Sequence, residues 1–293
     1  MDRIPLIKTM ALRRLVGLAF AGLAVLLAGI LIATGAAWPV LAAVVLVVML
    51  FRAALDRLLL ARESDRQSLP ARPEFYDFGA LDQPMHHEEL AGRPLKSLNF
   101  VVFDTETTGL SPSGGDEIVA IAGVRIVDGE IRRDGAFTRL VNPGRPIPKQ
   151  SIRFHGITDE MVRGEAPAAE VLPAFHDFIE DAVLVAHNAA FDMKFLKLKE
   201  SACGRRFDNL VLDTLLLSVF LDHDGHDHTL DAIAARYDVD VEGRHTALGD
   251  ALVTASIFLR MLNILEARGV RTLRQAVDAT NKIAHVRKMQ EKF

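Results

Sequence analysis

The sequence predicts a mixed α/β domain that follows a pair of membrane-spanning helices. Between residues 100 and 142, apolar strand-like runs are joined by short connections. Further along, short apolar runs alternate with helix-like segments, as in a sheet flanked by helices. Near the start, no charged residue occurs between Leu15 and Phe51, although charged residues make up 25% of the chain. A chain of 293 residues can hold one sizeable domain and an additional segment.

The N-terminal apolar stretch is too long for one membrane-spanning helix, because the hydrocarbon layer is only ~30 Å thick. The run "TGAAWP" interrupts it with Gly35 and Pro39. We therefore expect two spans, about 15–34 and 38–57, that contact the lipid bilayer over 15–57.

Positive charge predicts how this hairpin is oriented. Basic residues flank both spans and are absent from the connection: Lys8, Arg13 and Arg14 before, Arg52, Arg57, Arg62 and Arg66 after. The positive-inside rule then predicts a multi-pass protein of the inner (cytoplasmic) membrane whose folded domain faces the cytoplasm. A single cysteine, Cys203, agrees with that compartment. A cleaved signal peptide and a buried hairpin in a soluble core are the alternatives.

Composition divides the chain into four parts. Residues 1–61 form the predicted membrane hairpin, and residues 62–97, rich in proline and charge, form a linker. Residues 98–266 have the pattern of a globular domain, and residues 267–293 form a basic, helical tail.

The first half of the domain predicts an antiparallel meander. "NFVVFDTE" is typical of a buried strand, and "EIVAIAGVRIVDGEI" contains a strand followed by the turn signal "DG". "AFTRLVN" is predicted to be the third strand, because Pro143 and Gly144 end it.

The second half alternates helices and strands. "APAAEVLPAFHDFIED" and "AAFDMKFLKLKESA" favour helices, whereas "AVLVAHN" and "NLVLDT" favour short strands. "TALGDALVTASIFLRMLNILEARG" predicts a long helix that ends before Gly269. Together the two halves predict a mixed sheet flanked by helices.

Two acids end the first predicted strand. Asp104 and Glu106 are separated by one residue and therefore project to the same face of the strand. Such close carboxylates repel each other, and a divalent cation would offset that cost. An acidic strand end that opens into a loop is the alternative.

Three further stretches contribute candidate residues. "AHNAAFD" places Asp192 in the first turn of a helix, and "RHTALGDA" contains His245 and Asp250. These two can converge only if His245 precedes the helix, because five helical residues separate side chains by about 140°. "FHGITDEM" predicts a loop entering a helix, with Thr158 as a candidate N-cap.

Four acids and one histidine together suit two-metal phosphodiester hydrolysis. Hard cations such as two Mg²⁺ (or Mn²⁺) ions take carboxylate oxygens as ligands. A histidine suits the role of general base, because its ordinary pKa lies near neutral pH.

"FDTETTGL", "HNAAFD" and "HTALGDA" resemble, in order, the three motifs of the DEDDh 3′–5′ exonucleases. That family includes the proofreading subunit of bacterial DNA polymerase III, RNase T and oligoribonuclease. The resemblance covers roughly residues 98–265 and implies an RNase H-like fold with a five-stranded mixed sheet.

The resemblance also implies roles for individual residues. The metal-binding acids would be Asp104, Glu106, Asp192 and Asp250, with His245 as general base. The residues that contact substrate would be Thr107, Leu110, Asn188 and Phe191.

The predicted function is a membrane-anchored 3′–5′ exonuclease that releases nucleoside 5′-monophosphates from single-stranded 3′ ends, with DNA favoured over RNA. One alternative is a membrane-tethered nucleic-acid-binding or signalling module with little turnover. Another is an oligoribonuclease-like enzyme that acts on short RNA. The membrane hairpin leaves open whether a polymerase is a partner.

The net charge of −4 excludes a general positive field as the source of nucleic-acid affinity. Binding would depend on a local groove and on metal ions. Candidate contributors to the groove are Lys194, Lys197, Arg153 and Arg205. The run "HDGHDH" (223–228) is a candidate second metal site or, alternatively, a solvated loop.

Overall fold

The computed structural model describes residues 88–222 and 227–281, and the predicted membrane hairpin (1–61) lies outside them. The described strands are β1 (Phe100–Thr107), β2 (Ile118–Val127), β3 (Glu130–Leu140), β4 (Val183–Ala186) and β5 (Val211–Asp213). The longer helices are α6 (Ala168–Ile179), α7 (Ala189–Cys203), α8 (Thr214–Asp222), α10 (Ala247–Ala267) and α11 (Leu273–Asn281). The shorter helical elements are α3 (Glu88–Ala91), η2 (Leu95–Ser97), η3 (Pro112–Gly114), α4 (Lys149–His155), α5 (Asp159–Val162) and α9 (Leu230–Arg236).

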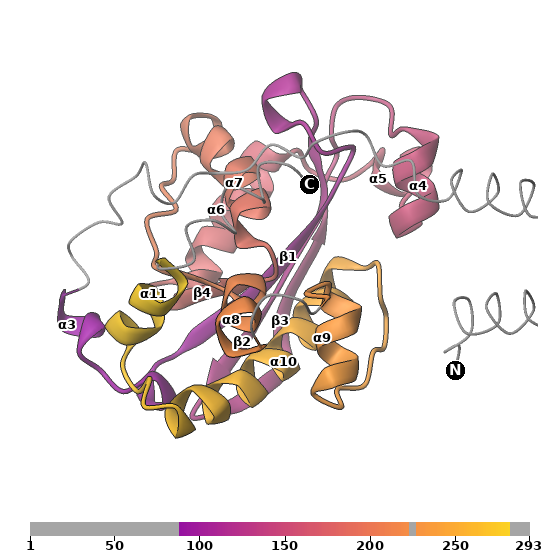
Figure 1. The fold of residues 1–293 in the computed structure, drawn as a ribbon. Coiled ribbons are helices and arrows are strands. Elements are labelled where there is room, and N and C mark those ends of the chain that lie inside the picture. Colours follow the sequence, from indigo (N-terminus) through magenta and orange to yellow (C-terminus); the bar gives the residue numbers. More distant parts are fainter. Residues whose placement is uncertain (1–87, 223–226, 282–293) are drawn as a thin grey trace, which may run out of the picture. The chain divides into compact units, whose positions relative to one another are not determined.

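The strands form one five-stranded mixed sheet in the order β3-β2-β1-β4-β5. β1 to β3 are antiparallel, whereas β4 and β5 run parallel to β1 (Figure 1). This arrangement confirms the predicted meander and the mixed sheet. β1 therefore has a neighbour on each side, and the residues at its end lie in the middle of the sheet.

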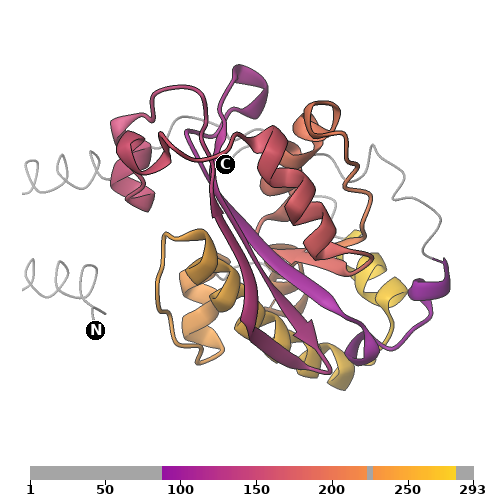
Figure 2. The ribbon, with the colours of Figure 1, turned by 180° about the vertical axis from the view of Figure 1, so that it is seen from behind.

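Helices cover both faces of the sheet (Figure 2). Odd-numbered residues of β1 pack toward α6 and α7, where the rings of Phe103 and Phe175 lie 5.7 Å apart. Even-numbered residues pack toward α8, α10 and α11, where Phe100 meets Phe258 edge-on at 4.9 Å. The alternation of β1 thus directs successive side chains to different helical layers.

α10 is the core helix of the second layer. Among the described residues it is the single helix long and apolar enough to cross a membrane, but 61% of its most apolar window is buried inside the domain. The helix is apolar because it packs on β1, β2 and α8 inside the domain. Gly269, with φ of +82°, follows its C-terminal end, as the sequence predicts.

Residues on both sides of the predicted domain pack onto it. Leu95, placed in the linker by its sequence context, is buried, and its N–H donates to the carbonyl of Arg271 at 2.8 Å. Leu273 and Ala276 of α11, in the predicted tail, are also buried. Residues 62–87 and 282–293 of these two segments lie outside the described residues.

β3 begins earlier than its apolar pattern predicts. The apolar run starts at Ala136, whereas the strand starts at Glu130. Its first residues are exposed and charged because β3 is an edge strand, and charged side chains are common on exposed edges.

Candidate active site

The two acids of β1 face α10. Asp104 and Glu106 share the parity of Phe100 and Val102, which pack in the core beneath that helix. Glu106 is buried and Asp104 is partly buried. The period of the strand thus places both carboxyls on the side from which α10 approaches.

Asp250 completes this group from the first turn of α10. Carboxylate oxygens of Asp104, Glu106 and Asp250 all lie within 4.8 Å of one another. The helix starts where the Thr246 hydroxyl oxygen accepts the N–H of Gly249 at 3.1 Å. This cap fixes the turn that carries Asp250, which is itself buried.

Asp192 approaches from the opposite layer. It lies in the first turn of α7, is buried, and accepts hydrogen bonds from the N–H of Thr105 at 3.1 Å and from its hydroxyl. Asp192 therefore lies beside the group formed by the other three acids, and its carboxylate is hydrogen-bonded to Thr105 of β1. Its charge nevertheless reaches the group and raises the pKa of Asp104.

The acids raise one another's pKa values. Burial, followed by the charges of Asp250 and Asp192, raises the pKa of Glu106 to about 8. Burial also raises the pKa of Asp192 to about 7, against the two hydrogen bonds from Thr105. The pKa of Asp104 is raised by burial and then by its acidic neighbours. In the absence of a cation, ionisation of these carboxyls therefore lowers the free energy of unfolding.

The donor set fits a divalent cation. Three buried or partly buried carboxylates converge, and Glu106 Oε1 is buried without a hydrogen-bond partner among the described residues. Buried polar atoms are normally satisfied, so an orphan oxygen in a converging acid group is expected at a metal site. Within residues 88–222 and 227–281, no second group of this kind is present. Of "HDGHDH", residues 223–226 lie outside the described residues, and His228 Nδ1 is hydrogen-bonded to Ser218 Oγ at 2.8 Å.

His245 precedes α10, as its spacing from Asp250 requires. Its backbone has a φ of +62°, in the left-handed region, and its N–H donates to Asp250 Oδ1 at 3.2 Å. The ring of Phe154, from α4, lies against the imidazole with centroids 4.4 Å apart. His245 Nδ1 is buried without a hydrogen-bond partner among the described residues. The histidine is thus held by backbone and ring contacts while this nitrogen stays unbonded.

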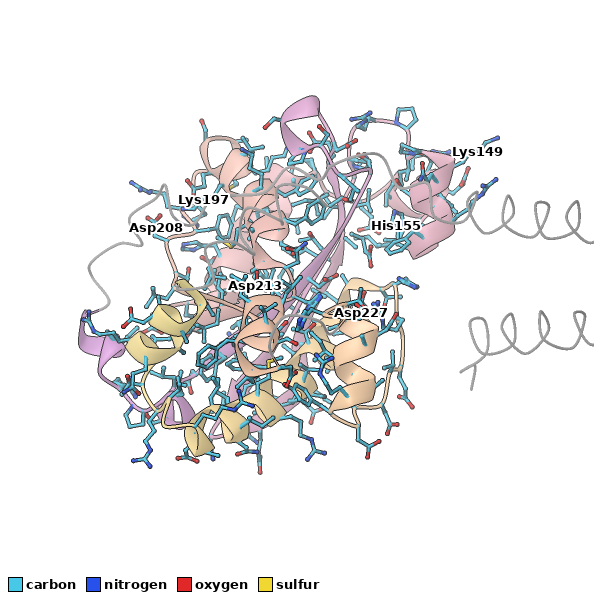
Figure 3. The ribbon with its side chains drawn as sticks, in the orientation of Figure 1. Lys149, His155, Lys197, Asp208, Asp213 and Asp227 are labelled. Carbon is cyan, nitrogen blue, oxygen red and sulfur yellow. The ribbon has the colours of Figure 1, made fainter. Side chains whose placement is uncertain are left out.

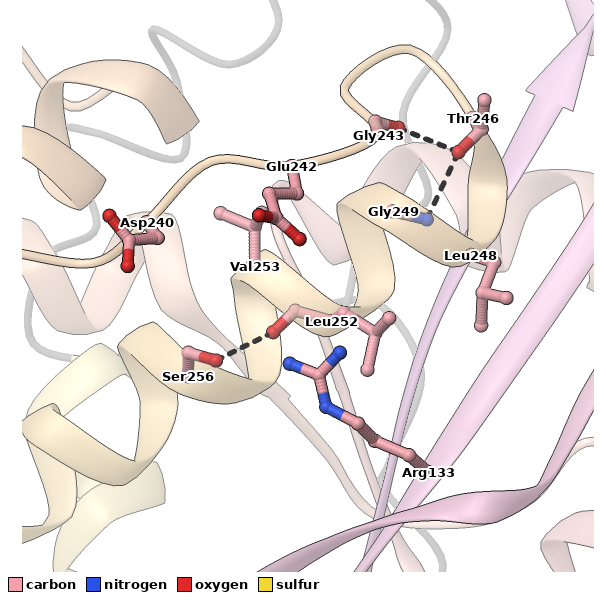
Figure 4. Close-up of a pocket in the computed structure, with 10 residues that line it drawn as sticks. All are labelled: Arg133, Asp240, Glu242, Gly243, Thr246, Leu248, Gly249, Leu252, Val253 and Ser256. Carbon is pink, nitrogen blue, oxygen red and sulfur yellow. Dashed lines mark hydrogen bonds between the residues drawn. The ribbon is translucent and has the colours of Figure 1, made fainter. Parts of the chain in front are cut away.

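The loop that carries His245 packs tightly on α10 (Figure 4). A Cβ added to Gly249 would lie 2.0 Å from the carbonyl oxygen of Gly243, so only glycine allows this approach. The Thr246 hydroxyl donates to the same carbonyl at 2.6 Å. A pocket of about 450 Å³ adjoins the loop and α10, and Arg133 lines it from β3. Loop and helix therefore form one packed unit that sets the position of His245.

The four predicted substrate residues lie close to the acids in the sequence but differ in their surroundings in the structure. Thr107 is buried at the end of β1, and its hydroxyl donates to the carbonyl of Gly109 at 2.7 Å. Leu110 is partly exposed in the following loop. Asn188 is the N-cap residue of α7, and the partly exposed Phe191 packs edge-on against another phenylalanine of that helix. Their contacts with substrate stay a prediction.

Asp213, at the end of β5, was not predicted to take part. It lies near the middle of the domain in Figure 3, and its carboxylate accepts the N–H groups of Asn188 and Ala189 at 3.0 and 3.1 Å. These bonds fix the left-handed conformation of Asn188, with φ of +61°, and the start of α7. Asp213 also raises the pKa of Asp192 through its charge. It thereby positions the helix that carries one of the four acids.

α4 lies against the loop that follows β1. The Ser151 hydroxyl donates to the carbonyl of Thr108 at 2.7 Å, and His155 is buried. Thr158 is the N-cap residue of α5, as predicted, but its side chain makes no capping hydrogen bond to a backbone N–H, so the capping interaction is absent. Phe154, in the segment "FHGITDEM", is 50% exposed and was not among the predicted site residues.

Two of the proposed groove cations are engaged elsewhere. Lys197 forms an ion pair with Asp208 at 3.0 Å, and both side chains are labelled in Figure 3. Arg205 lies 3.5 Å from Asp177. Arg244, which precedes His245, was not a candidate, although its guanidinium forms an ion pair with Asp250. Its position next to a motif histidine was the signal available in the sequence.

The chain is similar to known proteins of one family. The family model described as "Exonuclease" matches residues 101–258, which is more than half of the chain. A "DNA polymerase III subunit epsilon-like protein" of Rhodobacter capsulatus is 50% identical over 222 residues, 75% of this chain. A "DNA polymerase III PolC-type" of Caldanaerobacter subterraneus is 42% identical over 174 residues, 59% of this chain.

The chain spans only part of these relatives, 31% of the first and 12% of the second. Among solved structures, E. coli Exonuclease I in complex with a dT13 oligonucleotide is similar in fold, with a TM-score of 0.50 and 15% identity. That likeness covers 58% of this chain and 42% of the other. It agrees with the sheet and helix arrangement that the motifs predict.

Proposed function

The chain belongs to the exonuclease family, and we propose that it hydrolyses single-stranded 3′ ends with the help of divalent cations. Membership confirms the predicted enzyme class, a 3′–5′ exonuclease. The observation that carries the rest of the proposal is the convergence of three carboxylates, one of which, Asp250, accepts the backbone N–H of His245. This convergence supports our proposal that the chain belongs to the DEDDh branch of the family.

The acids would hold the cations, two Mg²⁺ or Mn²⁺ ions. Asp104, Glu106 and Asp250 present oxygens to a common point, and Asp192 adds its charge from α7. When bound, the cations supply activation of water and stabilisation of the negative charge that develops on the leaving 3′ oxygen. They would also allow the buried carboxyls to ionise, since a cation offsets the repulsion that raises their pKa values.

His245 would act as the general base that removes a proton from the attacking water. Its backbone is tied to Asp250, and its ring is held against Phe154, so the imidazole is oriented before substrate arrives. Its Nδ1 is not already engaged by a protein group among the described residues. A positioned base of this kind contributes about 10²–10⁴-fold to turnover.

The substrate would be a single strand of DNA in preference to RNA. The names of the relatives, which contain DNA polymerase III, support this choice and a polymerase as a candidate partner. The exposed ring of Phe154 lies beside His245, where a terminal base could stack on it. The products would be nucleoside 5′-monophosphates.

The enzyme would act at the cytoplasmic face of the inner membrane. The uncharged stretch from Leu15 to Phe51, with basic residues on both sides, supports a helical hairpin that binds the bilayer through residues 15–57. Membrane fractionation and cysteine labelling at residue 36 test this part. Full-length protein that stays in solution without detergent would contradict it.

The decisive assay measures release of mononucleotides from 3′-labelled and 5′-labelled oligonucleotides of DNA and RNA, from dinucleotides upward. We expect Mg²⁺-dependent shortening from the 3′ end, with DNA cut faster than matched RNA, and no shortening by Asp104→Ala. Binding without turnover would favour the tethered module, and preference for RNA dinucleotides would favour the oligoribonuclease-like alternative.

A further inference from the structure

Arg244 is paired with one member of the three-acid group. Its Nη1 forms an ion pair with Asp250, and its Nε bonds Asp231 Oδ1, on α9, at 2.6 Å. The Arg244 side chain is only 20% exposed. Its charge also acts beyond Asp250, because it lowers the pKa values of Asp104 and Glu106 against the larger effects that raise them. The charge of one guanidinium therefore acts on three of the acids, although its ion pair within the group is with Asp250.

This position conflicts with a divalent cation. Asp250 Oδ1 already accepts from the Arg244 guanidinium and from the N–H of His245. A cation held by Asp250 would lie within a few ångström of a fixed positive charge, in a partly buried site where such repulsion is poorly screened. Arg244 can leave Asp250 and stay attached to the domain, because its bond to Asp231 uses a different nitrogen.

We propose that Arg244 is the counter-ion of the carboxylate centre before metal binds and that it competes with the metal for Asp250. The inference rests on the proposed metal site. It assigns Arg244 two opposite effects: the residue stabilises the metal-free fold, and it weakens the binding of divalent cations. A residue that only supported the loop would increase both the stability of the metal-free fold and the affinity for divalent cations. Measuring stability and affinity separately therefore distinguishes the two roles.

The test compares Mn²⁺ binding to the full chain in detergent, by calorimetry and without substrate. Arg244→Met removes the charge and keeps the aliphatic stem, Arg244→Gln keeps a hydrogen-bond donor, and Arg244→Lys keeps the charge. Arg236→Met is the matched control, because Arg236 is 23% exposed and bonds Asp222 at 2.8 Å, away from the three-acid group.

We expect Mn²⁺ affinity to rise ~10-fold or more in Arg244→Met and Arg244→Gln, since a nearby unit charge is worth at least the ~1.4 kcal/mol of a tenfold change. Arg244→Lys and Arg236→Met should keep the affinity of the wild type. In the metal-free state at pH 8, Arg244→Met and Arg244→Gln should melt at lower temperature, and saturating Mn²⁺ should remove most of that difference.

Unchanged or weaker binding by whichever of the two uncharged variants folds would overturn the counter-ion role. Failure of the metal site itself gives a different result. In that case the wild type would bind no Mn²⁺, or Asp250→Ala would bind it as well as the wild type, and both proposals would fall.

Discussion

Glu106→Gln should make the metal-free protein more stable, and the gain should grow with pH. The carboxyl of Glu106 has an ordinary pKa of 4.5, and burial with its acidic neighbours raises it to about 8 in the folded protein. Between these pH values the folded state binds more protons than the unfolded state, so the free energy of unfolding falls as pH rises. Glutamine has a similar shape and no charge to lose.

The size of the effect follows from the two pKa values. At ~1.4 kcal/mol for each pH unit between 4.5 and about 8, the wild type loses of the order of 4 kcal/mol by pH 8. At pH 5 the loss is below ~1 kcal/mol, because the unfolded chain has only begun to ionise there. For a domain of this size, 4 kcal/mol corresponds to a rise of about 8–16 °C in melting temperature.

The assay is thermal melting followed by circular dichroism, with full-length protein in detergent and EDTA at pH 5 and pH 8. Glu130→Gln is the matched control, since that side chain is exposed on β3 and paired with Arg132. A melting temperature of Glu106→Gln that tracks the wild type at both pH values would refute the reasoning. With excess Mg²⁺ at pH 8 the wild type should instead have the higher melting temperature, because it binds the ion through the Glu106 carboxylate that the variant lacks.

Four further changes probe the site. Asp104→Ala should abolish Mg²⁺-dependent turnover while leaving the metal-free melting temperature equal or higher, since repulsion is relieved; near-normal activity would contradict the ligand role. His245→Ala should lower turnover by about 10²–10⁴-fold and leave Mn²⁺ binding largely intact, which calorimetry would check. Thr105→Val removes the hydroxyl that donates to Asp192, and it should lower the free energy of unfolding, measured in urea at neutral pH, by about 1–3 kcal/mol. Gly249→Ala should reduce turnover without removing any reactive group, because its Cβ would lie 2.0 Å from the Gly243 carbonyl and displace the loop; wild-type rates would show that the loop position is unimportant.

The sequence predicts this fold well where pattern and burial coincide. β1 and β2 are buried on both faces and appear as apolar runs, and α10 is an apolar helix ended by a glycine. β3 is less visible, because an edge strand exposes charged residues that carry no period-two signal. The packing of Leu95 beside α11 was missed for a related reason, since a short segment rich in proline and charge resembles a linker.

Some residues of the site could likewise be assigned from the sequence, whereas others could not. Asp104 and Glu106 could be assigned to one face from the strand period alone, and His245 could be placed before α10 from its spacing. The roles of Arg244 and Phe154 could not be assigned in this way, although Arg244 adjoins a motif histidine, because their contacts are with residues of other elements. Asp213 is similar: it ends a short strand, and only the fold brings its carboxylate to the start of α7.

The order of the acids along the chain has a consequence for biosynthesis. Glu106 is made early, but Asp250 lies in α10, so the three-acid group cannot form until that helix has left the ribosome. Synthesis of the intervening segment takes about 7–30 s at ~5–20 residues per second. β1 also needs β4, with Phe100 opposite Val183, before its second edge is paired. A nascent chain therefore carries most of the domain before its three carboxylates can come together.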